Sequence, residues 1–289
     1  MNRTATLFPN VQFIYELILA QLELDALGTA FEMNDALSSV KLLNVRNDQR
    51  LKSRLAYFQT VNGEYTDYFY ISRKNRTRSV NQYLTHWIYP YKGKFHPQMI
   101  RAALNIIGLQ PGETVLDPFI GSGTTALEAQ LLGVDCVGLD ASPLCVLQSR
   151  VKTASREVIK EIRAQCEALP APSRGEAGLD EKALNCIASG ADQRVQDFFR
   201  LAKLVALSDS VRRRKDFASA FDTRTKLMVQ SVADYDQIQR ELKLSLGRAT
   251  IEQGDARALP LCDESIDGII TSPPYAIALD YIKNDAHAL

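Results

Sequence analysis

The segment that decides the fold is Asp117-Pro118-Phe119-Ile120-Gly121-Ser122-Gly123-Thr124-Thr125. It follows an apolar run and precedes residues rich in alanine and leucine, so the sequence predicts a strand, a glycine-rich loop and a helix in succession. The two glycines let a ligand approach the backbone, and the first N–H groups of the helix have no partner within it. Because open α/β sheets bind ligands at the carboxyl ends of their strands, we expect a binding site here. Taken alone, a G-x-G loop suits a tight turn without a ligand equally well.

Elements of the same kind lie on both sides of this segment. They are helices over 97–107, over 124–132 and from 143 onward, and strands over 114–117, 136–140, 249–252 and 266–270. Ser142 is placed as the N-cap of the third helix, and Pro143 as its first residue. Strands that alternate with helices predict an α/β fold with a mostly parallel sheet.

Composition and pattern divide the chain into four parts. They are an N-terminal α+β extension (1–85), the ligand-binding half of the sheet (86–152), a helical insertion (153–245), and the third and fourth strands (246–289). In the extension, the alternation of Tyr65, Asp67, Phe69 and Ile71 predicts a strand. The insertion is charged, with apolar residues at helical spacing, and is much longer than an ordinary connection between a strand and a helix.

Two acidic residues follow predicted strands at the expected ligand-binding edge. Asp140 ends the second strand, where an acid can accept hydrogen bonds from ribose hydroxyls, and Asp255 follows the third strand. The phosphate-binding motif G-x-x-x-x-G-K-[ST] is absent, and no third glycine completes the dinucleotide motif. The pattern favours a ligand with a ribose but without a pyrophosphate.

A rigid turn, Thr271-Ser272-Pro273-Pro274-Tyr275, follows the fourth strand. The prolines fix their φ angles and have no N–H to donate, which leaves the Ser272 hydroxyl and main-chain carbonyls as acceptors. The ring of Tyr275 supplies a stacking face beside them. An exocyclic amino group of a nucleobase, which has two N–H donors and belongs to a flat ring, suits this arrangement.

Together, these two motifs resemble those of S-adenosylmethionine-dependent DNA amino-methyltransferases of the TSPPY type. Lys94-Phe95-His96-Pro97 is similar to the motif that these enzymes place over the methionine end of the cofactor. The resemblance covers roughly residues 86–152 and 248–282. It implies a Rossmann-like methyltransferase fold, S-adenosyl-L-methionine as cofactor and DNA as partner.

The resemblance also implies residue roles and a reaction. The cofactor-binding residues would be Phe95, Asp117, Phe119, Gly121, Gly123, Thr124, Asp140 and Asp255, and the catalytic residues Ser272, Pro273, Pro274 and Tyr275. Asp140 would bind the ribose and Asp255 the adenine amino group. The methyl group would pass to the amino nitrogen of a flipped-out base, with cytosine N4 favoured, and without a covalent intermediate. The alternatives are an RNA guanine or adenine amino-methyltransferase, and an incomplete or regulatory subunit.

The chain departs from the family pattern after the proline turn. Family sheets have seven strands, whereas only residues 276–289 follow the turn here. From this we expect an incomplete sheet, as in a split enzyme, a truncated gene or a fragment. A second polypeptide would then supply the remaining strands, and activity would be weak or absent without it.

Composition sets the remaining expectations. The 289 residues carry 34 basic and 34 acidic side chains, so no overall basic charge indicates a nucleic-acid partner. The run Arg212-Arg213-Arg214-Lys215 favours a solvated helix face over a phosphate contact. The five cysteines form no C-x-x-C pair, which favours reduced thiols and no metal site. No apolar run of membrane-spanning length and no signal peptide is apparent, and we expect a cytoplasmic location.

Overall fold

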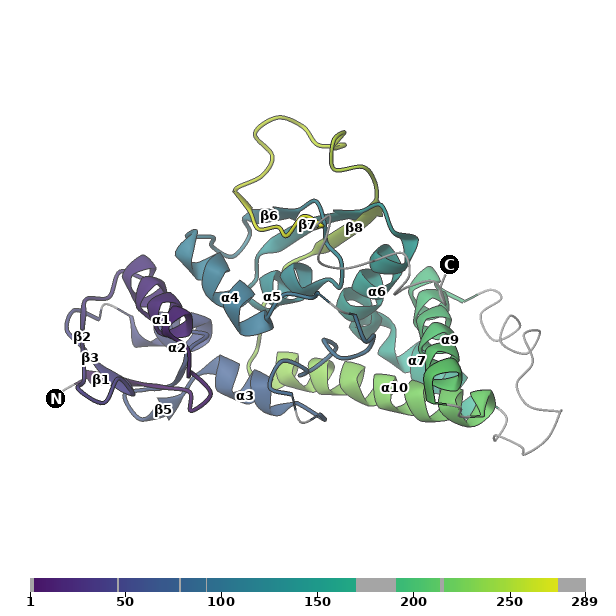
Figure 1. Ribbon diagram of the computed structural model, residues 1–289, viewed down its shortest axis with the longest axis horizontal. Helices are drawn as coiled ribbons and strands as arrows, with labels where there is room; N and C mark the ends of the chain where they lie inside the picture. The colour runs from purple at the N-terminus through teal and green to yellow at the C-terminus, as the bar shows by residue number, and fades with distance from the viewer. Residues whose placement is uncertain are drawn as a thin grey trace.

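The computed structural model describes residues 3–45, 47–77, 79–91, 93–169, 191–213 and 216–274 (Figure 1). It contains an antiparallel sheet near the N-terminus, a parallel sheet in the middle and a group of long helices on the other side (Figure 1). Within those ranges, no helix combines the length and the apolar character that crossing a membrane requires.

The N-terminal unit is an antiparallel sheet of order β2-β3-β1-β4-β5, accompanied by three helices. Its elements are β1 (Arg3–Leu7), α1 (Ile14–Ala26), β2 (Phe31–Met33), β3 (Ser39–Leu42), α2 (Asp48–Arg54), β4 (Phe58–Val61), β5 (Glu64–Tyr65) and α3 (Asp67–Arg73). Ala20 and Leu24 on α1 are fully buried and belong to one apolar core with Ala5 and Phe58 of the sheet. This core gives the unit its stability.

The predicted strand over residues 65–71 is wrong. Only Glu64–Tyr65 is strand, and Asp67–Arg73 forms helix α3. The Thr66 side chain accepts a hydrogen bond from the N–H of Phe69 at 3.3 Å, and Asp67 lies in the first turn of the helix. An N-cap and an acidic first turn stabilise a helix start, and here they outweigh the alternating pattern.

The second sheet confirms the predicted α/β class. All its strands are parallel, in the order β8-β7-β6-β9, with β6 (Thr114–Asp117), β7 (Asp135–Asp140), β8 (Ala249–Gln253) and β9 (Gly268–Ile269). The strand predicted over 266–270 is therefore present but shorter. The chain runs from β6 through β7 to β8 in one direction and then returns to the other side of β6 as β9. Such a reversal of strand order is where open α/β sheets bind ligands.

Three helices lie together on one side of the parallel sheet (Figure 1): α4 (Pro97–Ile106), α5 (Thr124–Leu131) and α6 (Pro143–Ala154). Their predicted starts are confirmed. Pro97 and Pro143 occupy first helical positions, and the Ser142 hydroxyl accepts a hydrogen bond from the N–H of Cys145 at 3.4 Å. These caps fix where each helix begins relative to the strand before it.

The predicted helical insertion is also confirmed. It contains η1 (Ser155–Val158), α7 (Ile159–Ala168), α9 (Gln193–Arg213) and α10 (Phe217–Glu241). Helices α9 and α10 pack against each other, and α9 also packs against α6. α10 runs back under the molecule to α3 (Figure 1), where Asp234 accepts hydrogen bonds of 2.7 and 2.9 Å from Arg76. The insertion therefore connects the outer face of α6 to the N-terminal unit.

A buried polar seam, formed by Glu23, Arg54, Arg101, Asn105 and Glu128, joins the N-terminal unit to the helices of the parallel sheet. Glu23 accepts hydrogen bonds from Asn105 at 2.6 Å and from the N–H of Ala56 at 2.8 Å, and Arg54 donates to Asn105 at 2.7 Å. Burial raises the pKa of Glu23 to about 7, although these donors favour its ionised form.

The other half of the polar seam centres on Glu128 of α5. Its carboxylate accepts a hydrogen bond from Tyr83 at 2.6 Å, lies 2.8 Å from His86 Nε2 and pairs with Arg101 at 3.5 Å. Arg101 also donates to the carbonyl oxygens of Ser53 and Arg54, at 2.9 and 3.2 Å. Burial lowers the pKa of His86 to about 4, so its ring is neutral near pH 7.

Replacing Glu23 by glutamine should change the pH dependence of stability. The pKa of Glu23 is raised from 4.5 in the unfolded chain to about 7 in the fold. Its contribution to the free energy of unfolding is therefore fully present below pH 4.5 and is lost as the pH rises through 7. Each pK unit corresponds to 1.36 kcal/mol, so the free energy of unfolding of Glu23→Gln should rise by about 3 kcal/mol, relative to that of the native chain, when the pH is changed from 4 to 8. Urea unfolding at both pH values measures this.

Glu32→Gln, on an exposed strand position, controls for the loss of one surface carboxylate. The opposite pH response of His86 is present in every variant and cancels in the comparison. If Glu23→Gln and the native chain differed in free energy of unfolding by the same amount at both pH values, the raised pKa of Glu23 would be contradicted.

Candidate functional site

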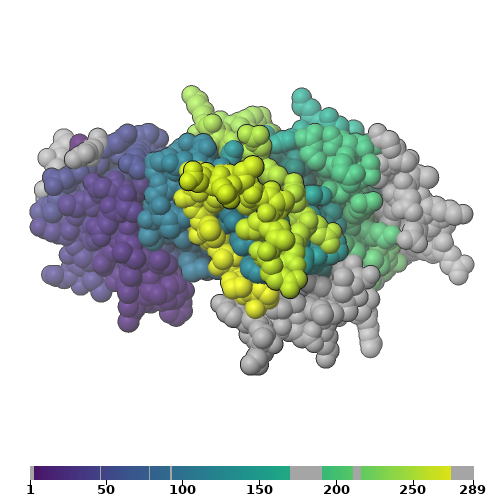
Figure 2. Space-filling view, turned by 90° about the horizontal axis from the view of Figure 1, so that it is seen from above, coloured from purple at the N-terminus to yellow at the C-terminus, as the bar shows by residue number. Residues whose placement is uncertain are grey.

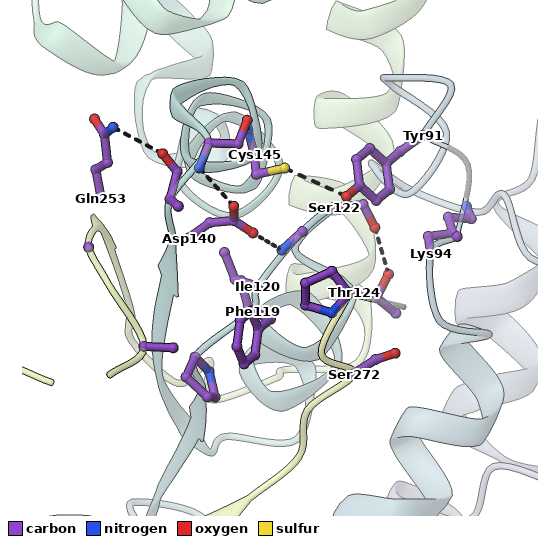
Figure 3. A pocket seen from close by; sticks show the side chains of 18 of the residues that line it. Tyr91, Lys94, Phe119, Ile120, Ser122, Thr124, Asp140, Cys145, Gln253 and Ser272 are labelled. Atoms are coloured by element: carbon purple, nitrogen blue, oxygen red, sulfur yellow. Dashed lines mark hydrogen bonds between the residues drawn. The ribbon is translucent and has the colours of Figure 1, made fainter. Parts of the chain in front are cut away.

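A cavity of about 1000 Å³ opens at the carboxyl ends of the parallel strands (Figure 3). Each of the four strands contributes the segment that follows it, and the segment before α4 completes the wall. The lining residues are Tyr91, Gly93, Lys94, Phe95, Pro118–Ser122, Thr124, Asp140–Pro143, Cys145, Gln253–Arg257, Ser272 and Pro274. The expected location of the binding site coincides with this cavity.

The glycine-rich loop after β6 forms the floor of the cavity. Gly121 and Gly123 have φ angles of +50° and +75°, a region that residues with a side chain rarely adopt. At Gly123, a Cβ atom would lie 2.8 Å from the Ser149 hydroxyl oxygen and 2.9 Å from the Ser149 Cα. Gly123 therefore serves both the turn and the close packing of the loop on α6.

Asp140 joins the loop to the end of β7. One carboxylate oxygen accepts the N–H of Gly121 at 2.9 Å, and the other accepts the N–H of Ser142 at 2.9 Å (Figure 3). The residue lines the cavity and is half-buried. A carboxylate has about four acceptor positions, so hydroxyl donors of a ligand can still bind it.

Asp117 lies beneath the cavity and is not part of its lining. Its carboxylate is 1% exposed and accepts hydrogen bonds from the Thr125 hydroxyl at 2.7 Å and from the N–H of Phe119 at 3.2 Å. Burial raises its pKa to about 6, while Thr125, Phe119 and Thr271 stabilise the ionised form. Asp117 therefore organises the loop and the turn after β9 from below.

The turn after β9 brings Ser272 and Pro274 to the cavity wall, whereas Pro273 is exposed and does not line it. Tyr275 lies outside the described residues. Seen from above, the segment that follows β8 covers the middle of the molecule, between the N-terminal unit and the insertion (Figure 2). The two motifs of the sequence, 150 residues apart, thus face one cavity.

Asp255 reaches the rim of the cavity, where it is paired. Arg257 donates to its two carboxylate oxygens at 2.6 to 3.0 Å, and these bonds lower the pKa of Asp255 to about 2. The sequence analysis did not single out Arg257. A ligand amino group that binds Asp255 has to share the carboxylate with Arg257 or displace it.

The wall opposite Asp140 comes from the segment before α4. Tyr91 and Lys94 lie there (Figure 3), and Phe95 also lines the cavity. Lys94 donates to the carbonyl oxygens of Asn81 and His86 at 3.2 and 3.3 Å, and burial lowers its pKa to about 8. Lys94 could be identified from the sequence, because it belongs to the motif Lys94-Phe95-His96-Pro97. Tyr91 carries no such signal.

The structure does not test the predicted exposure of the basic run Arg212-Arg213-Arg214-Lys215 in the insertion. Arg214 and Lys215 lie outside the described residues, and of Arg212 and Arg213 only the helical backbone is described. Their exposure therefore stays a prediction.

Gly123→Ala should destabilise the fold more than the same change at Gly112. Both glycines have positive φ angles, +75° and +90°, but a Cβ at Gly112 would meet no atom within 4 Å. Gly112→Ala should therefore cost only the backbone penalty of about 1–2 kcal/mol. Gly123→Ala should cost about 1–3 kcal/mol more, because it overpacks the contact with Ser149. Chemical unfolding of both variants measures the difference, and equal losses would contradict the crowded geometry.

Comparisons with known proteins support one family. Residues 16–149 match the model of the N6/N4 DNA methylases. The type II methyltransferase M.MjaII of Methanocaldococcus jannaschii is 38% identical over 90 residues, which are 31% of this chain and 16% of the relative. M.BsoBI of Geobacillus stearothermophilus is 36% identical over 96 residues, 33% of this chain and 18% of the relative.

A third relative acts on RNA by its name. The tRNA (guanine(10)-N2)-dimethyltransferase of Methanothermobacter thermautotrophicus is 42% identical over 50 residues, 17% of this chain and 15% of the relative. In each of these three pairs, the match spans less than a fifth of the relative's length.

The family match includes most of the N-terminal unit, which the sequence motifs alone did not connect to the methylases. The order of the parallel strands, with a glycine-rich loop after β6, is that of a Rossmann-like methyltransferase fold. Residues 16–149, which include the glycine-rich loop and the first two parallel strands, are therefore similar to the N6/N4 DNA methylase family.

Proposed function

We propose that the chain binds S-adenosylmethionine in the cavity and transfers its methyl group to an exocyclic amino group of a DNA base, with cytosine N4 as the target. One observation carries the proposal: the glycine-rich loop after β6 and the Ser-Pro-Pro turn after β9 line the same cavity. A cofactor on the loop would thus lie beside a base held at the turn.

The residues of the cavity fit this cofactor. Its volume of about 1000 Å³ admits a ligand of this size together with a base. Gly121 lines the cavity and has a φ of +50°, which lets the backbone turn there without a side chain, whereas Gly123 packs on α6 and is not part of the lining. Asp140 offers acceptor positions for ribose hydroxyls, and Phe95 and Phe119 offer apolar contacts. Thr124 adds a hydroxyl near the proposed methionine end. When bound, S-adenosylmethionine supplies a methyl group activated by its sulfonium.

The chain's own contribution to the reaction is to hold and orient the base. The Ser272 hydroxyl and nearby main-chain carbonyls accept hydrogen bonds from the amino group, since Pro273 and Pro274 have no N–H to compete. These bonds favour a geometry in which the nitrogen lone pair points at the methyl group. The base must leave the duplex to reach this position, at a cost of a few kcal/mol, and Tyr275 is the proposed stacking partner.

DNA as the substrate is supported by the names of the type II methyltransferase relatives. A cytoplasmic location is part of this proposal. The RNA alternative is supported by the similarity to the tRNA guanine dimethyltransferase. Two further predictions have no test in the described residues: the need for a second polypeptide, and the division into residues 1–85, 86–152, 153–245 and 246–289.

The decisive experiment incubates the chain with methyl-labelled S-adenosylmethionine and either duplex DNA or transfer RNA, followed by digestion and mass spectrometry of the nucleosides. We expect N4-methylcytosine from DNA and no label in RNA. N6-methyladenine would correct the base, and label only in RNA would replace the proposal by its alternative. Cofactor binding without any turnover would favour the incomplete or regulatory subunit.

Ser272→Ala should lower the rate of methyl transfer by about 10- to 100-fold, since it removes an acceptor used in the transition state, with little change in cofactor affinity. Ser265→Ala is the matched control, because Ser265 is exposed in the segment before β9 and its hydroxyl donates to the carbonyl oxygen of Cys262. Equal rates of the two variants would argue against the role of Ser272.

Asp140→Asn should weaken S-adenosylmethionine binding by about tenfold or more, because a neutral amide accepts hydrogen bonds less strongly and has only one acceptor oxygen. Asp135→Asn, at the opposite end of β7, is the control; Asp135 accepts a hydrogen bond from the N–H of Arg248 at 2.7 Å, far from the cavity lining. Isothermal titration calorimetry compares both variants with the native chain. The same affinity in all three would contradict the ribose contact.

A further inference from the structure

Lys152 on α6 is a buried amino group that no step of the proposed reaction uses. Its side chain is 1% exposed, and burial lowers its pKa well below the usual value. Among the described residues, no carboxylate lies within ion-pair distance of it. Burying an amino group is costly unless it is hydrogen-bonded, so the partners of Lys152 matter for the fold.

The ammonium of Lys152 donates to the carbonyl oxygen of Ser122 in the glycine-rich loop, at 2.6 Å. Two neighbours on the same helix act in the same way on the preceding residue: Ser149 and Gln148 donate to the carbonyl oxygen of Gly121, at 3.1 and 3.2 Å. Three side chains of α6 that do not line the cavity thus hold two successive carbonyl groups of the loop.

This arrangement determines where the N–H groups of the loop point. In a trans peptide, the C=O and N–H bonds point in opposite directions. Holding the Gly121 carbonyl toward α6 therefore directs the N–H of Ser122 away from α6. The N–H of Gly123 donates to the carbonyl of Ile120 at 2.8 Å, which closes the turn, and the N–H of Gly121 donates to Asp140. The N–H of Ser122 is therefore the donor that this loop offers to a ligand.

We propose that Lys152 is a positioning residue that fixes the conformation of Ser122 in the glycine-rich loop, so that the Ser122 N–H faces the carboxylate of the amino-acid part of the cofactor. The inference rests on the proposed function. Lysine suits this task because its long side chain reaches the loop from α6 and its amino group donates to the Ser122 carbonyl, while Ser149 and Gln148 hold the carbonyl of the residue before it.

The test compares two ligands that differ in the amino-acid part. S-adenosylmethionine has the carboxylate, and 5′-methylthioadenosine keeps the adenosine but lacks the amino-acid group. Lys152→Met should weaken binding of S-adenosylmethionine by about tenfold or more while changing the affinity for 5′-methylthioadenosine less than twofold. Lys152→Arg should restore part of the loss, and Lys160→Met, on the exposed face of α7, should bind both ligands like the native chain.

The outcomes separate the two proposals. Native chain that binds neither ligand would overturn the proposed function, and this inference with it. Native chain that binds both, with equal losses or no loss in Lys152→Met, would overturn the inference alone. If Lys152→Met is unfolded by circular dichroism, Lys152→Gln, which keeps a neutral donor, takes its place. In ligand-free protein, hydrogen exchange of the loop amides should be faster in the variant than in the native chain.

Discussion

One buried carboxylate at the end of the central strand holds the functional face together. Asp117 accepts hydrogen bonds from Thr125 at the start of α5 and from the N–H of Phe119 in the loop, and Thr271 of the turn after β9 bonds to the same side chain. Burying a carboxylate costs several kcal/mol unless its oxygens are satisfied, so these bonds stabilise the fold only when formed together. The two segments that bear the proposed chemistry are therefore fixed at one distance from each other.

Above this carboxylate, the loop is held from two sides. Asp140 at the end of β7 accepts the N–H of Gly121, and α6 donates to the carbonyls of Gly121 and Ser122. A loop whose glycines permit many conformations is thus restricted to one, and a ligand need not pay the entropy of ordering it. The insertion supports the same arrangement indirectly, because α9 packs on the outer face of α6.

The sequence predicted the parallel strands, the helix starts and several of the residues that line the cavity, because these depend on local signals. Proline at a first helical position, serine at an N-cap and an acid at a strand end each act within a few residues. Lys152 and Arg257 could not be found in this way, since a lysine on a helix and an arginine in a loop look like surface residues until the tertiary contacts are known. Asp117 was expected to touch the cofactor, but its partners lie beneath the cavity. The strand expected at 65–71 is a helix instead, because the Thr66 N-cap stabilises a helix start more than the alternating pattern favours a strand.

The polar seam between Glu23, Arg54 and Asn105, continued by Arg101 and Glu128, limits how such a chain can be recombined with its relatives. Each half of the seam has its donors and acceptors on the other half. A chimera joined between the antiparallel sheet and α4 would bury groups whose partners come from another parent, unless those positions were exchanged as a set.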